Sequence, residues 1–154
     1  MRISRHQCFM QVAEVVARRS TCFRRNVGAV ITVDHRIVSV GYNGSASGEA
    51  HCTGAGCAGP NGCTRAIHAE VNAINHVPKG AGGRHWRMYV TESPCPSCAD
   101  ELEQSPCSEV YFLNQYRLTE GNAKLVAANI RLFRMTPAGH IVDWATNELI
   151  EDEK

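Results

Sequence analysis

The sequence predicts an α/β domain in which one mixed β-sheet is covered by helices on both faces. Two observations carry this prediction: a β-hairpin in the N-terminal third, and a later alternation of helical and β-branched segments. Strands joined through helices run parallel, and their crossovers place the helices on the faces of the sheet. The 154 residues suffice for one domain with its own core. We expect a single domain over 1–154, with its core over about 4–135 and a tail over 136–154.

The N-terminal part is predicted to hold a helix and the β-hairpin. The helix is expected over 4–19, because apolar residues recur at helical spacing after Ser4, a suitable N-cap. Two β-branched runs, 27–33 and 37–42, flank a tight turn at 34–36 and predict paired antiparallel strands. The apolar positions of the helix are Phe9, Val12, Ala13 and Val16.

The second half of the chain alternates between the two kinds of element. The glycines and the proline between 78 and 83 mark the end of its first helix. The tail has no firm assignment, and a short helix after Asp143 is its one candidate element. The predicted order is helix 68–75, strand 86–91, helix 95–104, strand 109–113, helix 122–129 and strand 130–135.

Composition and charge exclude several classes of function. The net charge is +1, so the chain has no electrostatic footprint for DNA or RNA. No apolar run reaches the length of a membrane span, and the N-terminus lacks the apolar core of a signal peptide. We therefore expect a soluble protein of the cytoplasm, or of the host cytoplasm if the source is a phage. Eight Cys and seven His in such a chain favour metal binding over disulfides.

Two short segments carry the strongest chemical signal. Cys95 and Cys98 have the spacing of a metal knuckle, and Pro94 favours a helix whose first turn would favour thiolates. His68 is the expected third ligand, and three protein ligands leave the fourth position of a tetrahedral zinc open, as in catalytic sites. Glu70 is the natural proton shuttle beside that open position. The alternative reading is a closed, purely structural zinc knuckle.

The segment 44–63 is rich in glycine and shows no core-forming pattern. A loop of this length inside a compact domain needs something to hold it. A second metal with four thiolate ligands would do so, and a closed site of this kind is structural. The alternative is a set of ordinary reduced thiols. The expected ligands are Cys22, Cys52, Cys57 and Cys63, with His51 as a substitute.

Four motifs occur in one order and together resemble a known family. They are Val-Gly-Ala-Val-Ile at 27–31, Gly-Tyr-Asn-Gly at 41–44, His-Ala-Glu-Val-Asn-Ala-Ile at 68–74, and Tyr-Val-Thr followed by Pro-Cys-x-x-Cys-Ala within 89–99. Over about 4–135 the chain resembles the deoxycytidylate (dCMP) deaminases of phages and bacteria, in the cytidine-deaminase-like superfamily. The resemblance implies one CMP/dCMP-type deaminase domain with a three-layer α-β-α fold and a central five-stranded mixed sheet.

The resemblance also implies a reaction and residues for it. The expected reaction is hydrolysis of dCMP to dUMP and ammonia, which feeds dTMP synthesis. Water activated at the zinc would attack C4 of the base, while Glu70 takes its proton and passes protons to N3 and to the leaving amine. The backbone of Ala69 is expected to hold the pyrimidine edge, Asn43 the sugar, and Tyr116 to contact substrate or simply pack. The 5′-phosphate needs a cation, for which the candidates are Arg24, Arg25, Lys79 and Arg117.

Assembly and regulation follow from the resemblance as well. The family implies homo-oligomers, with hexamers favoured, activated by Mg²⁺-bound dCTP and inhibited by dTTP. The effector candidates are Tyr42, Asn43, Gly44 and Lys79. The run at 45–48 departs from the usual proline-containing sequence, which bears on effector binding. The cysteines of the second set resemble the structural zinc site of many bacterial and phage members.

Two other functions stay open. One is deamination of a different substrate, such as free deoxycytidine, a modified dCMP or a base in tRNA. The other is a non-catalytic, zinc-stapled subunit that binds nucleotides, although such a module has no need of the proton shuttle Glu70. The near-zero net charge argues against a nucleic-acid substrate.

Overall fold

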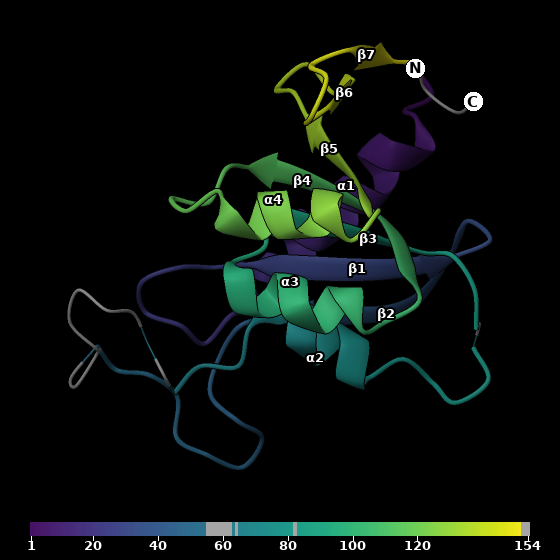
Figure 1. The fold of residues 1–154 in the computed structure, drawn as a ribbon. Helices are drawn as coiled ribbons and strands as arrows, with labels where there is room; N and C mark the ends of the chain where they lie inside the picture. The colour runs from purple at the N-terminus through teal and green to yellow at the C-terminus, as the bar shows by residue number, and fades with distance from the viewer. Residues whose placement is uncertain (55–62, 64, 82, 152–154) are drawn as a thin grey trace.

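The computed structural model describes residues 1–54, 63, 65–81 and 83–151 (Figure 1). Its elements match the predicted ones to within a few residues as far as β5, and none of the described helices is long and apolar enough to cross a membrane. The helices are α1 (Arg5–Ala17), α2 (Ala69–Asn75), α3 (Pro96–Glu103) and α4 (Glu120–Ala127). The strands are β1 (Gly28–Val33), β2 (Arg36–Tyr42), β3 (Trp86–Glu92), β4 (Cys107–Asn114), β5 (Arg131–Met135), β6 (Ile141–Asp143) and β7 (Leu149–Ile150).

The strands of the described chain form one sheet in the order β2-β1-β3-β4-β5-β6-β7. Strands β3, β4 and β5 run parallel, and the other neighbours pair antiparallel. The sheet is mixed, as predicted, but these residues give it seven strands where five were expected. The tail supplies β6 and β7. The expected short helix after Asp143 is wrong, because Oδ1 of Asp143 accepts the N–H groups of Ala145 and Thr146 at 2.9 Å and closes a turn there.

Helices cover both faces of the sheet, which confirms the predicted layers. Within the described residues, α2, α3 and α4 lie over one face and α1 over the other (Figure 1). Successive side chains of a strand point to opposite faces. Ile31 therefore joins the core under α2–α4, whereas its neighbour Val30 joins the core under α1. The parallel strands β3 and β4 both end at the same edge, where their following loops meet.

Local sequence signals explain the first elements. Ser4 caps α1, since its hydroxyl accepts the Gln7 N–H while the Gln7 side chain accepts the Ser4 N–H. The hairpin between β1 and β2 turns at Asp34 and His35, whose φ angles are 47° and 60°. Two successive positive φ angles give the turn the twist that matches its strands.

Gly41 allows α2 to lie directly on β2. A Cβ at this position would overlap the carbonyl oxygen of Ala69 and would lie 2.5 Å from the backbone nitrogen of Ala73. These obstacles are backbone atoms of a helix, which cannot turn aside as a flexible side chain can. The absence of a side chain at this position therefore fixes the distance between α2 and the sheet.

We expect Gly41→Ala to lower the free energy of unfolding by about 2 kcal/mol or more, because α2 must move as a body away from β2. Urea unfolding followed by circular dichroism measures this. The matched control is Gly83→Ala, because a Cβ at Gly83 meets nothing within 4 Å. The control should stay within about 0.5 kcal/mol of the parent protein. Equal unfolding midpoints for the two variants would contradict the packing argument.

Candidate metal centre and active-site pocket

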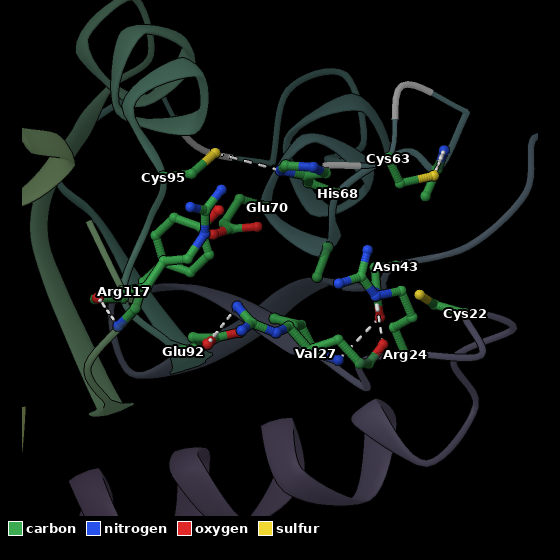
Figure 2. A pocket seen from close by; sticks show the side chains of 15 residues that line it. Cys22, Arg24, Val27, Asn43, Cys63, His68, Glu70, Glu92, Cys95 and Arg117 are labelled. Atoms are coloured by element: carbon green, nitrogen blue, oxygen red, sulfur yellow. Dashed lines mark hydrogen bonds and ion pairs between the residues drawn. The ribbon is translucent and has the colours of Figure 1, made fainter. Parts of the chain in front are cut away.

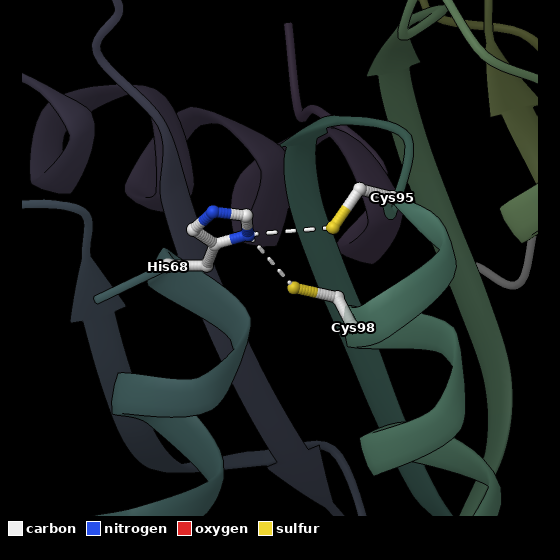
Figure 3. A group of neighbouring side chains, drawn as sticks. All are labelled: His68, Cys95 and Cys98. Carbon is white, nitrogen blue, oxygen red and sulfur yellow. Dashed lines mark hydrogen bonds between the residues drawn. The ribbon is translucent and has the colours of Figure 1, made fainter. Parts of the chain in front are cut away.

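The N-terminal ends of α2 and α3 bring the three predicted metal ligands together (Figure 3). His68 is the N-cap of α2 and Cys95 is the N-cap of α3, and neither side chain caps its own helix. Both side chains therefore remain available for another role. Pro96 opens α3, where its missing N–H costs nothing, and Cys98 follows within the first turn.

The geometry of this group fits a tetrahedral metal ion. Nδ1 of His68 lies 3.1 Å from Sγ of Cys98 and 3.4 Å from Sγ of Cys95. All three ligand atoms lie within 4.8 Å of one another, in the one such group found among the described residues. Ligand atoms around a tetrahedral zinc are about 3.5–3.8 Å apart, so a small adjustment would admit the ion. One imidazole and two sulfurs form a donor set that zinc prefers.

The electrostatics of the group favour negative charge on one of its two sulfurs, that of Cys95. Hydrogen bonding, first of all from the Cys98 thiol and then from His68 and Ser97, lowers the pKa of Cys95 to about 3. The same hydrogen bond to Cys95, together with burial, raises the pKa of Cys98. The pKa of His68 is raised as well, chiefly by its hydrogen bond to Cys95. A divalent cation would neutralise the two sulfurs as thiolates, with release of the remaining protons.

Glu70 lies in the first turn of α2, two residues beyond His68, and lines the pocket next to the ligand group (Figure 2). Glu70 is only 4% exposed. Burial raises the pKa of its carboxyl to about 7, although hydrogen bonding to its own backbone N–H opposes the change. A carboxyl with a pKa near neutrality can both take up and release a proton, as a shuttle must.

The pocket has a volume of about 420 Å³ and opens from the ligand group towards the loops. Small-molecule sites usually measure roughly 300–1,000 Å³, so a nucleotide-sized ligand fits. The pocket brings together the catalytic candidates, three arginine side chains and the predicted substrate contacts. The predicted residues that line it are Cys22, Arg24, Arg25, Asn43, Cys63, His68, Ala69, Glu70, Cys95, Tyr116 and Arg117.

Charged and aromatic side chains gather around Tyr116, in the loop after β4. The guanidinium carbon of Arg25 lies 5.2 Å from the centre of the Tyr116 ring, and that of Arg117 lies 5.7 Å from it. Nη1 of Arg25 also donates to Oε1 of Glu92 at 2.8 Å. Glu92 lines the pocket but was not among the predicted site residues. The sequence could place Glu92 at the carboxyl end of β3, three residues before Cys95, but it could not place it beside Arg25.

Asn43 lines the pocket as predicted, but its amide is engaged with the neighbouring loop. Its Oδ1 accepts the N–H of Val27 at 2.9 Å and the hydroxyl of Ser20 at 2.6 Å, and its Nδ2 donates to the carbonyl oxygen of Arg25 at 2.8 Å. Asn43 therefore holds the backbone of the loop that carries Arg25. This role was missed because it depends on contacts across 16 to 23 residues of sequence.

A hydrogen-bond relay that the sequence did not reveal supports Tyr116. Oγ of Ser93 accepts the N–H of Tyr116 at 2.7 Å and the side-chain amide of Gln115 at 2.9 Å. Oε1 of Gln115 in turn accepts from the fully buried Asn122 of α4 at 2.9 Å. The relay ties the loop after β4 to the loop before α3, and so fixes Tyr116 relative to Cys95.

The second set of predicted ligands is only partly visible. Cys22 and Cys63 line the pocket on the side away from Arg117 (Figure 2), and the Ala66 N–H donates to Sγ of Cys63 at 3.4 Å. Cys57 lies outside the described residues. Among the residues that are described, Cys22, Cys52, Cys63 and the exposed His51 do not form a compact ligand group.

The remaining candidates lie apart from the ligand group. Lys79 follows α2 in an exposed turn and does not line the pocket, which separates it from the other phosphate candidates. Tyr42 ends β2, and its carbonyl oxygen accepts the side-chain amide of Asn72 at 2.7 Å. Gly44 forms an isolated antiparallel bridge with Ile67, so the loop after β2 is tied to the residue before His68.

Comparison with known proteins agrees with this geometry. The family model of the cytidine and deoxycytidylate deaminase zinc-binding region matches residues 3–114. The ComE operon protein 2 of Bacillus subtilis is 42% identical over 118 residues, which cover 75% of this chain and 62% of that protein. The deoxycytidylate deaminase of Saccharomyces cerevisiae is 32% identical over 152 residues, which cover 92% of this chain and 49% of that protein. The chain thus spans only about half to three fifths of the length of these relatives.

One solved structure is matched over nearly its whole length, unlike the two relatives above. The dCMP deaminase from the cyanophage S-TIM5, in complex with dCMP and dUMP, superposes with a TM-score of 0.74 at 30% sequence identity. The match covers 84% of this chain and 95% of that one. The family match includes His68, Glu70, Cys95 and Cys98. The first three line one pocket, and the buried Cys98 belongs to the same ligand group as His68 and Cys95. The chain belongs to the cytidine and deoxycytidylate deaminase family.

Proposed function

We propose that the protein hydrolyses dCMP to dUMP and ammonia. One observation carries the proposal: a buried carboxyl, Glu70, lies beside a His-Cys-Cys group in a nucleotide-sized pocket. The similarity to a dCMP deaminase solved with dCMP and dUMP supports this choice of substrate. The reaction consumes one water, replaces the exocyclic amine at C4 by oxygen, and needs no oxidant or reductant.

We assign a separate role in the reaction to each group of residues in and beside the pocket. A zinc ion held by His68, Cys95 and Cys98 would supply Lewis-acid activation of water. The Glu70 carboxylate takes a proton from the water and gives it to N3. It then takes the second proton from the hydroxyl formed at C4 and gives it to the departing amine, which leaves as ammonia. Burial of Glu70 in the first turn of α2 limits the access of bulk water to this exchange. The backbone of Ala69, also buried in the pocket wall, holds the pyrimidine edge.

The 5′-phosphate is assigned to the cations around Tyr116. Arg24, Arg25 and Arg117 line the same pocket as Glu70, whereas Lys79 does not. Arg25 is the principal candidate, because Asn43 fixes its backbone and Tyr116 lies against its guanidinium. An arginine held in this way loses little freedom when it binds a phosphate.

We expect Arg25→Gln to raise KM for dCMP about tenfold or more with a much smaller change in kcat, since the lost contact is distant from the base. KM for deoxycytidine, which has no phosphate, should not change. Arg134→Gln is the charge-matched control, because Arg134 is exposed on β5 and outside the pocket. An unchanged KM for dCMP in the Arg25 variant would remove it from the phosphate site.

A second, structural zinc is proposed for Cys22, Cys52, Cys57 and Cys63, with His51 as a substitute ligand. The hydrogen bond that the Ala66 N–H donates to Sγ of Cys63 supports it, because metal ligands are commonly held in place by hydrogen bonds of this kind. Elemental analysis should give two zinc per chain, falling to one in Cys57→Ser. One zinc in the parent protein would refute the second site.

Assembly and regulation remain part of the proposal. We propose a homo-oligomer, with a hexamer favoured, activated by dCTP with Mg²⁺ and inhibited by dTTP through the loop at 41–48. This role would place the protein in the cytoplasm of its cell or of a phage-infected host. Light scattering measures the assembly, and rates with and without each effector measure the regulation.

The test of the main proposal is ultraviolet loss of substrate with dCMP, deoxycytidine and CMP in parallel, on protein of known zinc content. Turnover of dCMP in preference to the other two would establish the reaction and show that the phosphate and the deoxyribose are both recognised. Preference for deoxycytidine would reassign the substrate. No turnover of any of them by zinc-loaded protein would overturn the proposed reaction.

A further inference from the structure

Two acidic side chains line the pocket among the residues that the structure describes, Glu70 and Glu92. Glu92 is the one that contacts Arg25, the proposed phosphate ligand. It ends β3, its side chain is 19% exposed, and its Oε1 accepts from Nη1 of Arg25 at 2.8 Å. The contact joins the strand that leads to Cys95 with the loop that holds Arg25. Figure 2 shows Glu92 on the pocket wall below Glu70.

The pair places an anion of the protein where an anion of the substrate is expected. A guanidinium has five N–H donors, and Arg25 donates to Glu92 through one hydrogen bond rather than two parallel ones. Arg25 is half-exposed, lines the pocket and has its guanidinium against Tyr116, so a ligand in the pocket can reach its other N–H donors.

Binding of a phosphate must disturb this arrangement in one of two ways. If Arg25 keeps both partners, the carboxylate and the phosphate carry like charges at close range. If Arg25 leaves Glu92 for the phosphate, a largely buried carboxylate loses its partner. The Glu92 side chain is 19% exposed, and this burial raises the pKa of its carboxyl even beside Arg25. Both outcomes oppose phosphate binding.

We propose that Glu92 is a built-in counter-ion of the phosphate site, which holds Arg25 in the empty protein and weakens the binding of the 5′-phosphate. This inference rests on the proposed function, because it takes a nucleoside monophosphate as the ligand. Weaker binding of the phosphate would also affect the release of the product. Substrate and product carry the same phosphate, so a phosphate held too tightly would slow the departure of product.

Glu92→Gln separates charge from position. Glutamine has the same shape and can still accept a hydrogen bond from Arg25, but it brings no negative charge. We expect calorimetry to show dUMP binding about five- to tenfold tighter in this variant, with deoxyuridine binding unchanged. In turnover, KM for dCMP should fall by a similar factor while kcat stays level or decreases.

The control is Asp100→Asn, which also removes one negative charge from an ion pair, at 2.6 Å from Lys124 on the surface of α3 and α4. Its affinity for dUMP should stay within about twofold of the parent protein. Glu92→Ala removes both charge and hydrogen bond, and should gain less affinity than Glu92→Gln because Arg25 is then less well held.

Three results would overturn the inference. The first is dUMP binding as weak as, or weaker than, that of the parent in Glu92→Gln, which would make Glu92 a support for phosphate binding. The second is an equal gain for deoxyuridine, which would make the effect independent of phosphate. The third is a parent protein that does not bind dUMP. Failure of the proposed reaction is a distinct outcome, because dUMP binding is measured without any turnover.

Discussion

Glu70→Gln should lower kcat for dCMP by at least about 100-fold, and by as much as about 10,000-fold, while the zinc content stays that of the parent protein. Glutamine preserves the size of the side chain at this position of α2 but cannot take a proton from water or return it to N3. Initial rates from ultraviolet absorbance and zinc by elemental analysis measure the two quantities on one sample. An active variant with its zinc in place would remove Glu70 from the proton-transfer role.

The same variant should also change how the free energy of unfolding depends on pH. Burial raises the pKa of Glu70 from 4.5 to about 7, so between these values the folded protein binds more protons than the unfolded chain. Stability linked to Glu70 is therefore complete below about pH 4.5 and is lost as the pH rises to about 7. Metal-free Glu70→Gln lacks this loss, and should gain stability relative to the metal-free parent over that range in urea unfolding. Exposed Glu14→Gln should show no such gain.

Cys98→Ser should lose both the catalytic zinc and the activity. Cys98 is 1% exposed, and its sulfur lies 3.1 Å from Nδ1 of His68, so a hydroxyl there leaves two strong ligands for the metal. Zinc affinity should fall by at least about 100-fold, since the ligand itself is removed and not merely its support. Dialysis against a zinc buffer followed by elemental analysis measures the affinity, and dCMP turnover measures the activity.

Cys8→Ser is the matched control for this loss. Cys8 is exposed on α1 and takes no part in the ligand group. Its zinc content and rate should equal those of the parent protein. If Cys98→Ser kept its full zinc and rate, the His-Cys-Cys group would not be the catalytic metal site.

The sequence predicted those elements that are long and strongly patterned. The hairpin and α1 were found because β-branched residues, turn residues and Ser4 are all local signals that agree with one another. The strands β6 and β7 were missed because runs of three and two residues carry no measurable alternation. Their pairing depends instead on β5, the edge against which they form.

The residues of the candidate site also fall into two groups, those that local sequence signals predict and those that depend on distant contacts. His68, Glu70, Cys95 and Cys98 were predicted because their chemistry is set by spacing within two short segments, and the structure does bring the three ligands together. Glu92 was missed because its importance comes from Arg25, which is 67 residues away in the sequence. No spacing rule links a strand end to a distant loop, so side-chain pairs of this kind emerge only from the folded structure.

The attachment of the ligand group to helix ends has a practical consequence for protein engineering. His68, Cys95 and Cys98 belong to α2 and α3, which are packed on the sheet, whereas Arg25 and Tyr116 belong to the loops at 20–27 and 115–119. The proposed metal ligands and the proposed phosphate contacts therefore occupy separate stretches of the chain. If the proposed reaction holds, libraries confined to the two loops can alter the recognition of the phosphate without changing the metal ligands.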